Sequence, residues 1–333
     1  MTRSKWRRRA ANSPRAGLAE ISTDRALGAL YGLAIGDALG MPTQELDGPT
    51  AKRILGTPPD FREGPAENPI AHGLPAGSVT DDTMQCLLIA DLLISGGGMI
   101  DPHRLAEALA AWEREMAERG RSELLGPSTR RALAAVAAGE DPSQTGRTGT
   151  TNGAAMRITP VGIATPVEPF DRLLAAVVSA DLVTHDTDIA HAGAAAVAAV
   201  VSAGVSGETF EQAAPRAVRA AARFGYADMF EEALRLGSLD AIVDRFGTGV
   251  ETAESVPTAF GVARFSHGDV WEACGHAAAL GGDTDTIAAL AGAMVGACTG
   301  LHALPPDAVQ KIREVNDIEF ESRVDGLLKL RRR

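Results

Sequence analysis

Two short acidic clusters are the residues of this chain best suited to chemistry. The first is Thr80-Asp-Asp-Thr83 and the second is Gly281-Gly-Asp-Thr-Asp-Thr286, and an apolar stretch of helical length follows each. Each cluster alone is typical of a helix start, because Thr and Asp are favoured N-caps and early acids suit the helix dipole. A cap needs one oxygen, however, whereas the two clusters together supply four carboxylates and several hydroxyls.

Crowded carboxylates repel one another, so a site built from both clusters needs a cation or shifted pKa values. Every donor in the clusters is a hard oxygen, which favours Mg²⁺, Mn²⁺ or Ca²⁺ over zinc. Such ions lower the pKa of a bound water and polarise a substrate oxygen. If packing brings the two helix starts together, six ligands that would suit a dinuclear site converge: Thr80, Asp81, Asp82, Asp283, Asp285 and Thr286.

The elements that must position these clusters are predicted to be helices. Ala and Gly are abundant, aromatic residues make up only 4% of the chain, and clear β-type alternation is hard to find. We therefore predict an all-α fold, with one domain over residues 23–330 after a basic, disordered tail at residues 1–22. Apolar residues recur at helical spacing over residues 83–94, 105–116, 129–138, 173–183, 189–203, 210–224 and 287–299.

Composition excludes several classes of protein. The 333 residues are 45% hydrophobic, which allows a large core, and the net charge of −11 argues against non-specific binding of nucleic acid. The basic N-terminus has no apolar run behind it, and no stretch approaches the roughly 18 apolar residues of a membrane span. The widely spaced Cys86, Cys274 and Cys298 indicate buried thiols in a reducing compartment. We expect a cytoplasmic protein with no nucleic-acid or membrane partner.

Four blocks, in order, resemble the ADP-ribosylglycohydrolase family: Gly32-Leu-Ala-Ile-Gly-Asp-Ala-Leu-Gly-Met-Pro42, Thr80-Asp-Asp-Thr83, Gly153-Ala-Ala-Met-Arg157 and Gly281-Gly-Asp-Thr-Asp-Thr286. The resemblance implies a single compact domain of orthogonal helices around two Mg²⁺ or Mn²⁺ ions, held by the six ligands named above. It implies a hydrolase in which a metal-held water cleaves the glycosidic bond between ADP-ribose and an acceptor, an ADP-ribosylated side chain. Asp82, Asp283 and Glu45 are then the candidate catalytic residues.

Candidate substrate contacts lie in a Gly/Thr-rich loop at residues 146–153, whose backbone N–H groups could cradle phosphate or ribose oxygens. The alternative for this loop is an ordinary turn. Gly149, Asn152 and Gly153 are its candidate residues, and the last two fall where family members contact ADP-ribose. His185 matches a family position near the nucleotide, although a lone His before a helix is more often a cap or a surface residue. Asp37 is expected to be a structural acid bonded to a neighbouring helix end.

Two positions depart from the family's pattern. Many members carry Glu after a Gly-Asp-x-x-Gly-x-Pro-x segment, whereas this chain has Gln44, a candidate substrate contact, followed by Glu45. Gln cannot accept a proton, so Glu45 takes that role, the role moves elsewhere, or the chemistry differs. Many members also carry an acid two positions before a Gly near Gly126, where this chain has Leu124 after Glu123.

Three functions therefore stay open. The first is hydrolysis of an ADP-ribosyl bond on a modified protein, and the second is hydrolysis of an N-glycosidic bond in a small ribosylated metabolite or nucleoside. The third is a non-catalytic ADP-ribose binder. The proline-rich segment at residues 56–77 leads into the first acidic cluster, and a loop of this length is usually functional or mobile. A haloacid-dehalogenase-type nucleophile at Asp283 is rejected, because glycines and an alanine-rich stretch precede it instead of a buried strand.

Overall fold

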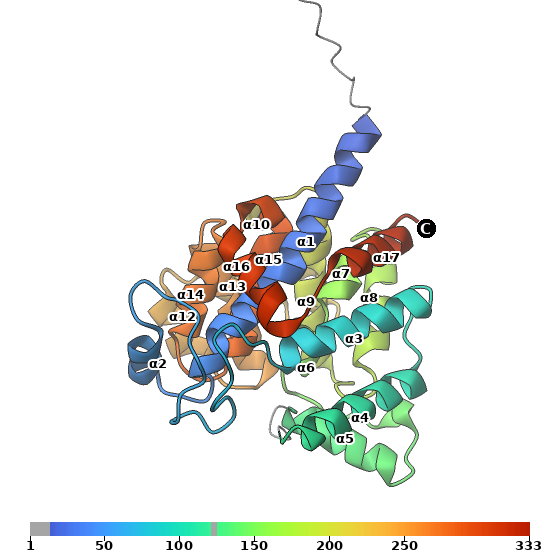
Figure 1. The fold of residues 1–333 in the computed structure, drawn as a ribbon. Helices are drawn as coiled ribbons and strands as arrows, with labels where there is room; N and C mark the ends of the chain where they lie inside the picture. The colour runs from blue at the N-terminus through green and yellow to red at the C-terminus, as the bar shows by residue number, and fades with distance from the viewer. Residues whose placement is uncertain (1–13, 121–124) are drawn as a thin grey trace, which may run out of the picture.

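The computed structural model describes residues 14–120 and 125–333, and within those ranges it is built of helices, with no named β-strand (Figure 1). The prediction of an all-α fold is confirmed. The α-helices are α1 (Pro14–Gly40), α2 (Gly48–Leu55), α3 (Asp81–Ser95), α4 (Pro102–Glu118), α5 (Pro127–Ala137), α6 (Gly153–Met156), α7 (Thr159–Ala164), α8 (Phe170–Asp181), α9 (Asp188–Val205), α10 (Phe210–Ala222), α11 (Ala227–Arg235), α12 (Leu239–Phe246), α13 (Thr252–Phe265), α14 (Val270–Ala278), α15 (Thr284–Thr299), α16 (Pro306–Asn316) and α17 (Glu321–Arg331). Short 3-10 turns are η1 (Met41–Thr43), η3 (Pro142–Gln144) and η4 (Leu301–Ala303).

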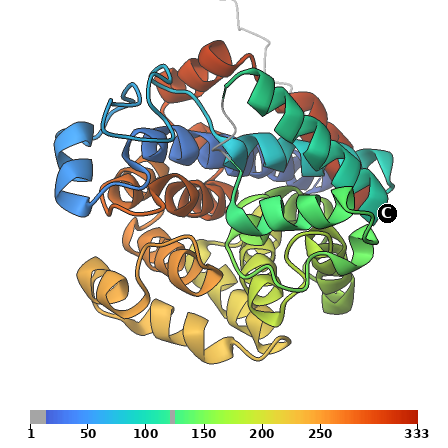
Figure 2. The ribbon, with the colours of Figure 1, turned by 90° about the horizontal axis from the view of Figure 1, so that it is seen from below.

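Helices α1 and α15 form an antiparallel pair through the centre of the molecule (Figure 2). Glycines line their contact, and a Cβ atom at Gly32 would lie 2.2 Å from the carbonyl oxygen of Gly292. The two backbones therefore touch where any side chain would hold them apart. The same contact continues to the end of the pair, where a Cβ atom at Gly40 would lie 2.4 Å from the oxygen of Thr284. It places the end of α1 against the start of α15.

Asp37 connects the same pair to α3. Its buried carboxylate accepts from the backbone N–H of Thr80 at 2.9 and 3.0 Å, from the N–H of Thr83 at 3.1 Å and from the Thr83 hydroxyl at 2.5 Å. These are the donors that a helix start leaves unpaired. Asp37 is thus the expected structural acid bonded to a neighbouring helix end, and α1 holds the starts of both α3 and α15.

Some boundaries differ from the sequence-based expectation. Helix α1 begins at Pro14, upstream of the predicted domain start at residue 23, and residues 1–13 lie outside the described residues. Helix α9 is long and apolar enough to cross a membrane, unlike any stretch expected from the sequence, but 89% of it is buried inside the protein. We assign it as a core helix. Cys86, Cys274 and Cys298 are buried free thiols, as predicted.

Candidate active site

A cavity of about 240 Å³ collects residues from distant parts of the sequence. The first residues of α3 and α15 form one part of its wall, and the turn after α1 and the loop before α6 form others. Of the residues proposed from the sequence, the wall contains Gln44, Glu45, Asp81, Asp82, Asn152, Gly153, Asp283, Asp285 and Thr286.

The two acidic clusters meet in this wall. The Thr286 hydroxyl donates to Asp82 Oδ2 at 3.3 Å, which joins the starts of α15 and α3 across 204 positions of sequence. The Thr80 hydroxyl lies 3.5 Å from the same oxygen, but Thr80 is buried beside the cavity and is not part of its wall. The convergence of the two helix starts, which spacing alone left open, is therefore present, with five of the six proposed ligands on the cavity surface.

The electrostatics of the cluster favour a cation. Burial raises the pKa of Asp81, Asp82 and Asp285 well above the ordinary value of a carboxyl group, and the neighbouring carboxylates raise it further. Burial also raises the pKa of Asp283, against hydrogen bonds that lower it. Four buried acids with raised pKa values, three of them raised further by neighbouring carboxylates, form the arrangement that a bound divalent ion would stabilise.

The donors fit a hard divalent ion in their chemistry. Among the described residues no three His, Cys, Asp or Glu side chains already stand close enough together to hold a metal ion. Among the residues that the structure describes, the wall nevertheless offers only oxygen atoms as ligands at the two helix starts, and Asp82 Oδ1 is buried there without a hydrogen-bond partner. A buried carboxylate oxygen without a donor is costly unless a ligand completes its coordination.

The turn after α1 places Gln44 and Glu45 at the cavity. The backbone N–H of Glu45 donates to the oxygen of Gly282 at 2.8 Å, and Glu45 adopts a φ of 62°, a conformation that side-chain-bearing residues seldom take. Such strain concentrates at functional sites. Partial burial and the charge of Asp283 raise the pKa of the Glu45 carboxyl group. Gln44 is buried, and its Nε2 atom has no partner among the described residues.

Asn152 holds one of the carboxylates. Its Nδ2 atom donates to Asp283 Oδ2 and, at 2.8 Å, to the hydroxyl of Ser255 on α13. Both of its amide hydrogens are thus used within the protein, so Asn152 orients a proposed metal ligand from the cavity wall. Gln85 on α3 orients Asp81 in the same way, because its Nε2 atom donates to Asp81 Oδ2 at 3.1 Å.

Comparison with known proteins agrees with this geometry. The profile of the ADP-ribosylglycohydrolase family matches residues 19–333. The chain belongs to this family. It is therefore a glycohydrolase, as the sequence predicted. An uncharacterized protein of Escherichia coli, YegU, is 32% identical, and the match covers 93% of this chain and 98% of YegU. An ADP-ribosylarginine hydrolase of Pseudomonas putida, Tri1, is 31% identical over 88% of this chain and 75% of Tri1.

The fold agrees as well. A solved structure titled as an ADP-ribosylglycohydrolase-related protein complex superimposes with a TM-score of 0.70 at 30% identity, covering 93% of this chain and 99% of the other. The family fold implied by the four sequence blocks is thus present over nearly the whole chain.

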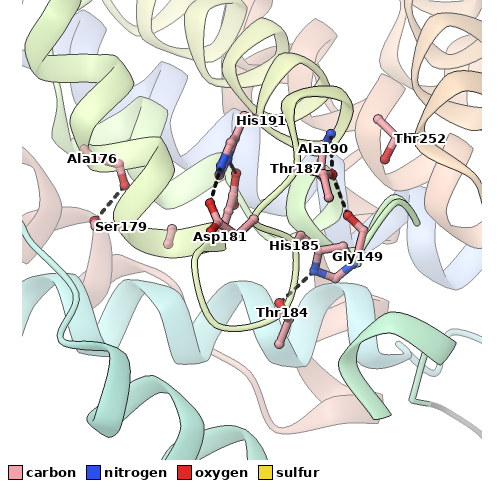
Figure 3. Close-up of polar contacts among 12 residues, drawn as sticks. Gly149, Ala176, Ser179, Asp181, Thr184, His185, Thr187, Ala190, His191 and Thr252 are labelled. Carbon is pink, nitrogen blue, oxygen red and sulfur yellow. Dashed lines mark hydrogen bonds and ion pairs between the residues drawn. The ribbon is translucent and has the colours of Figure 1, made fainter. Parts of the chain in front are cut away.

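Two of the proposed substrate contacts of this glycohydrolase lie behind the cavity wall instead of on it. His185 is wholly buried, and a Cβ atom at Gly153 would lie 2.7 Å from its Cε1 atom, so the imidazole packs under that glycine. Gly149 is also buried, and its carbonyl oxygen accepts from the Thr187 hydroxyl at 2.6 Å (Figure 3). Thr187 also caps α9, so the loop at residues 146–153 is tied to that helix start.

The structure adds residues that sequence reasoning missed. Ile70 from the proline-rich segment, Thr151 and Arg130 line the cavity, and the wholly buried Arg157 lies behind it. Arg157 offered a signal in the sequence, because it is a single cation within an otherwise apolar block. Ile70 and Thr151 lie in two segments that the sequence analysis singled out, but nothing marked these two residues within them, because their positions depend on how loops fold over the helices. Glu123 and Leu124, which depart from the family's pattern, lie outside the described residues.

Proposed function

We propose that this glycohydrolase cleaves the glycosidic bond between the ribose of an ADP-ribosyl group and a side-chain acceptor, and that it requires Mg²⁺ or Mn²⁺. The observation that carries the proposal is the meeting of two acidic helix starts, 204 positions apart, in one cavity, where one oxygen of Asp82 has no partner within residues 14–120 and 125–333. The similarity to a relative named as an ADP-ribosylarginine hydrolase supports the substrate class.

The residues proposed to hold two ions are Thr80, Asp81, Asp82, Asp283, Asp285 and Thr286. Divalent ions in such a site supply Lewis acidity and a water of lowered pKa. The chain's own residues orient the site: Asn152 and Gln85 hold Asp283 and Asp81 by neutral amide donors. Glu45, with its raised pKa and its place at the cavity, is the proposed acid–base residue.

The size of the cavity bears on the substrate. At about 240 Å³ it is somewhat smaller than the roughly 300–1,000 Å³ of sites that enclose a drug-sized ligand. It suits a ribose and the groups linked to it, with the remainder of a nucleotide extending past the rim. Gln44 supplies an amide at the cavity, which keeps a small ribosylated metabolite as the second candidate substrate.

The test is hydrolysis by purified protein with Mg²⁺ or Mn²⁺, with and without chelator. The substrates are ADP-ribosyl-arginine, an ADP-ribosyl-serine peptide and a panel of ribonucleosides, and the products measured are ADP-ribose and ribose. Asp283→Asn should abolish turnover, whereas Asp188→Asn, an exposed acid in the first turn of α9, should leave it unchanged. Release from ribonucleosides alone moves the substrate to the second candidate, and chelator-resistant turnover contradicts the metal requirement.

A further inference from the structure

A buried arginine stands behind the acidic wall. Arg157 Nη1 donates to Gln85 Oε1 at 3.0 Å, and Gln85 Nε2 donates onward to Asp81 Oδ2 at 3.1 Å. Burial lowers the pKa of Arg157 to about 10, against the charges of Asp181 and Asp81, so the guanidinium group remains a cation at neutral pH. The cation is thus linked to one proposed metal ligand through a neutral amide.

The same arginine begins a second chain of contacts that returns to the cavity. Its Nη2 atom donates to Thr184 Oγ1 at 2.5 Å, and that oxygen lies 2.7 Å from His185 Nδ1, as Figure 3 shows for Thr184 and His185. On the other edge of the imidazole, His185 Nε2 lies 3.0 Å from Thr151 Oγ1. Thr151 lines the cavity, so both ends of the buried network reach it.

Counting donors and acceptors shows in which direction the hydrogen bonds of this second series are donated. A guanidinium group only donates, so Thr184 Oγ1 accepts from Arg157. The proton of the Thr184 hydroxyl then has one acceptor within hydrogen-bond distance among the described residues, His185 Nδ1. A neutral imidazole that accepts at Nδ1 carries its hydrogen at Nε2 and donates it to Thr151 Oγ1.

The surroundings keep His185 neutral. Burial lowers the pKa of its imidazole well below the ordinary value, and the charges of Arg157, Arg131 and His191 lower it further. The ring is wholly buried against Gly153 and is not part of the cavity wall. His185 therefore acts on the cavity through Thr151.

Thr151 is the last residue in this series of hydrogen bonds. Its hydroxyl oxygen accepts from His185 and has no other partner among the described residues, so its proton is left for a ligand in the cavity. We propose that Thr151 is a specificity-determining donor, directed by Arg157 through Thr184 and His185, for a substrate oxygen that carries no hydrogen. The ligand class is a phosphoryl oxygen of the ADP-ribosyl group, for which Arg130 in the same wall supplies a cation. This inference rests on the proposed function.

One measurement tests the direction without any substrate. Nitrogen-15 NMR of the imidazoles, with the His185 signals assigned by their loss in His185→Asn, should show a neutral Nε2–H tautomer between about pH 6 and 8. Thr184→Val removes the hydroxyl that fixes this tautomer and should populate the Nδ1–H form. A wild-type His185 that is an Nδ1–H tautomer or an imidazolium in this range overturns the inference, whatever the enzyme hydrolyses.

A binding measurement tests the ligand class. Thr151→Val should weaken the affinity for ADP-ribose about 10- to 100-fold, since a hydrogen bond to a charged group is lost, and should leave the affinity for adenosine unchanged. Thr151→Ser, which keeps the hydroxyl, should stay within about threefold of wild type. Thr299→Val, the same change at the far end of α15, is the matched control.

The outcomes separate the two proposals. Unchanged ADP-ribose affinity in Thr151→Val, or an equal loss for adenosine, overturns the donor role of Thr151 and leaves the proposed function standing. No ADP-ribose binding by the wild-type protein overturns the ADP-ribosyl substrate and, with it, the phosphoryl assignment. In that case the tautomer of His185 still decides whether the hydrogen bonds run from Arg157 toward Thr151.

Discussion

Replacing Gly32 by Ala tests whether the contact between α1 and α15 positions the active site. The added methyl group would lie 2.2 Å from the carbonyl oxygen of Gly292 and 2.9 Å from its carbonyl carbon. Ordinary contact at a Cβ atom begins at 3.4 Å, so the backbones must separate by about an ångström. Neither neighbour is the end of a side chain that could turn away.

The magnitude follows from two opposing effects. Overpacking costs about 1–3 kcal/mol where side chains can adjust, and the upper end applies against a backbone. Ala is the better helix former by about 1 kcal/mol. We therefore expect Gly32→Ala to lower the free energy of unfolding by about 2 kcal/mol. In Gly326→Ala the new methyl group would lie 2.6 Å from Cδ1 and 2.9 Å from Cγ1 of Ile94, a half-buried side chain that can shift where a backbone cannot, so the change should stay within about 1 kcal/mol of zero.

Urea unfolding and steady-state kinetics give the two measurements. The separated helices carry Glu45 away from Asp283, and a displacement of about 1 Å can cost about 100-fold in rate. We expect kcat/KM of Gly32→Ala to fall at least tenfold at a temperature where the variant remains folded. If Gly32→Ala matches Gly326→Ala in both stability and rate, the glycine contact does not position the site.

Three further predictions concern single side chains. Asp37→Asn should lower the free energy of unfolding by about 2–3 kcal/mol in urea titrations, because Asp37 is buried and accepts several hydrogen bonds. Asp101→Asn at the exposed start of α4 is the control and should cost about 1 kcal/mol. Equal losses in the two variants contradict the structural role of Asp37. Burial lowers the pKa of His191, but Asp181 and Asp186 raise it more, so its net pKa lies above the ordinary value. The stability that His191 contributes is then full below about pH 6.5 and is lost as pH rises through the folded pKa. The difference in free energy of unfolding between wild type and His191→Gln should therefore shrink between about pH 6 and 9. A difference that grows over this range refutes the direction of the pKa shift. Gln44→Glu adds a carboxylate to an acidic wall, so it should lower the Tm measured without metal. It should also enlarge the rise in Tm when Mn²⁺ is added. A rise in Tm equal to that of wild type contradicts a place for Gln44 beside a bound ion.

The fold class was readable from the sequence for physical reasons, and so was the proposal that the two acidic helix starts share a site. Thr and Asp at a helix start have a local signature, and excess carboxylates at two such starts indicate a shared site. Asp37 was readable too, since an acid inside an apolar stretch needs buried donors. Residue spacing could not predict the contact that brings α1, α3 and α15 together. Small residues at helical spacing predict that a helix is closely approached, but they do not identify the helix that approaches it.

The burial of His185 could not be read from the sequence or from the family resemblance. The resemblance associates this position with the nucleotide, yet the imidazole lies under Gly153, bonded to Thr184 and Thr151. Its burial depends on a loop about 30 positions earlier in the chain, which pattern reading along one segment cannot detect. Short helices such as α6 and α7 were not predicted. Helix α7 is buried on every side, so its sequence lacks the alternation of polar and apolar faces that marks an amphipathic helix.

The buried donors around the cavity follow one chemical rule. Asp81, Asp82 and Asp283 accept from an amide, a hydroxyl and an amide, and none of them pairs directly with a cationic side chain among the described residues. A direct ion pair would orient a carboxylate but would also neutralise it and compete with a divalent ion for its oxygens. Gln85 stands between Arg157 and Asp81, so the guanidinium group orients the Asp81 carboxyl group through a neutral amide and forms no direct ion pair with it. Gln85→Ala should therefore weaken Mn²⁺ binding by loosening Asp81, whereas Gln85→Lys, which places a cation beside Asp81, should weaken it far more.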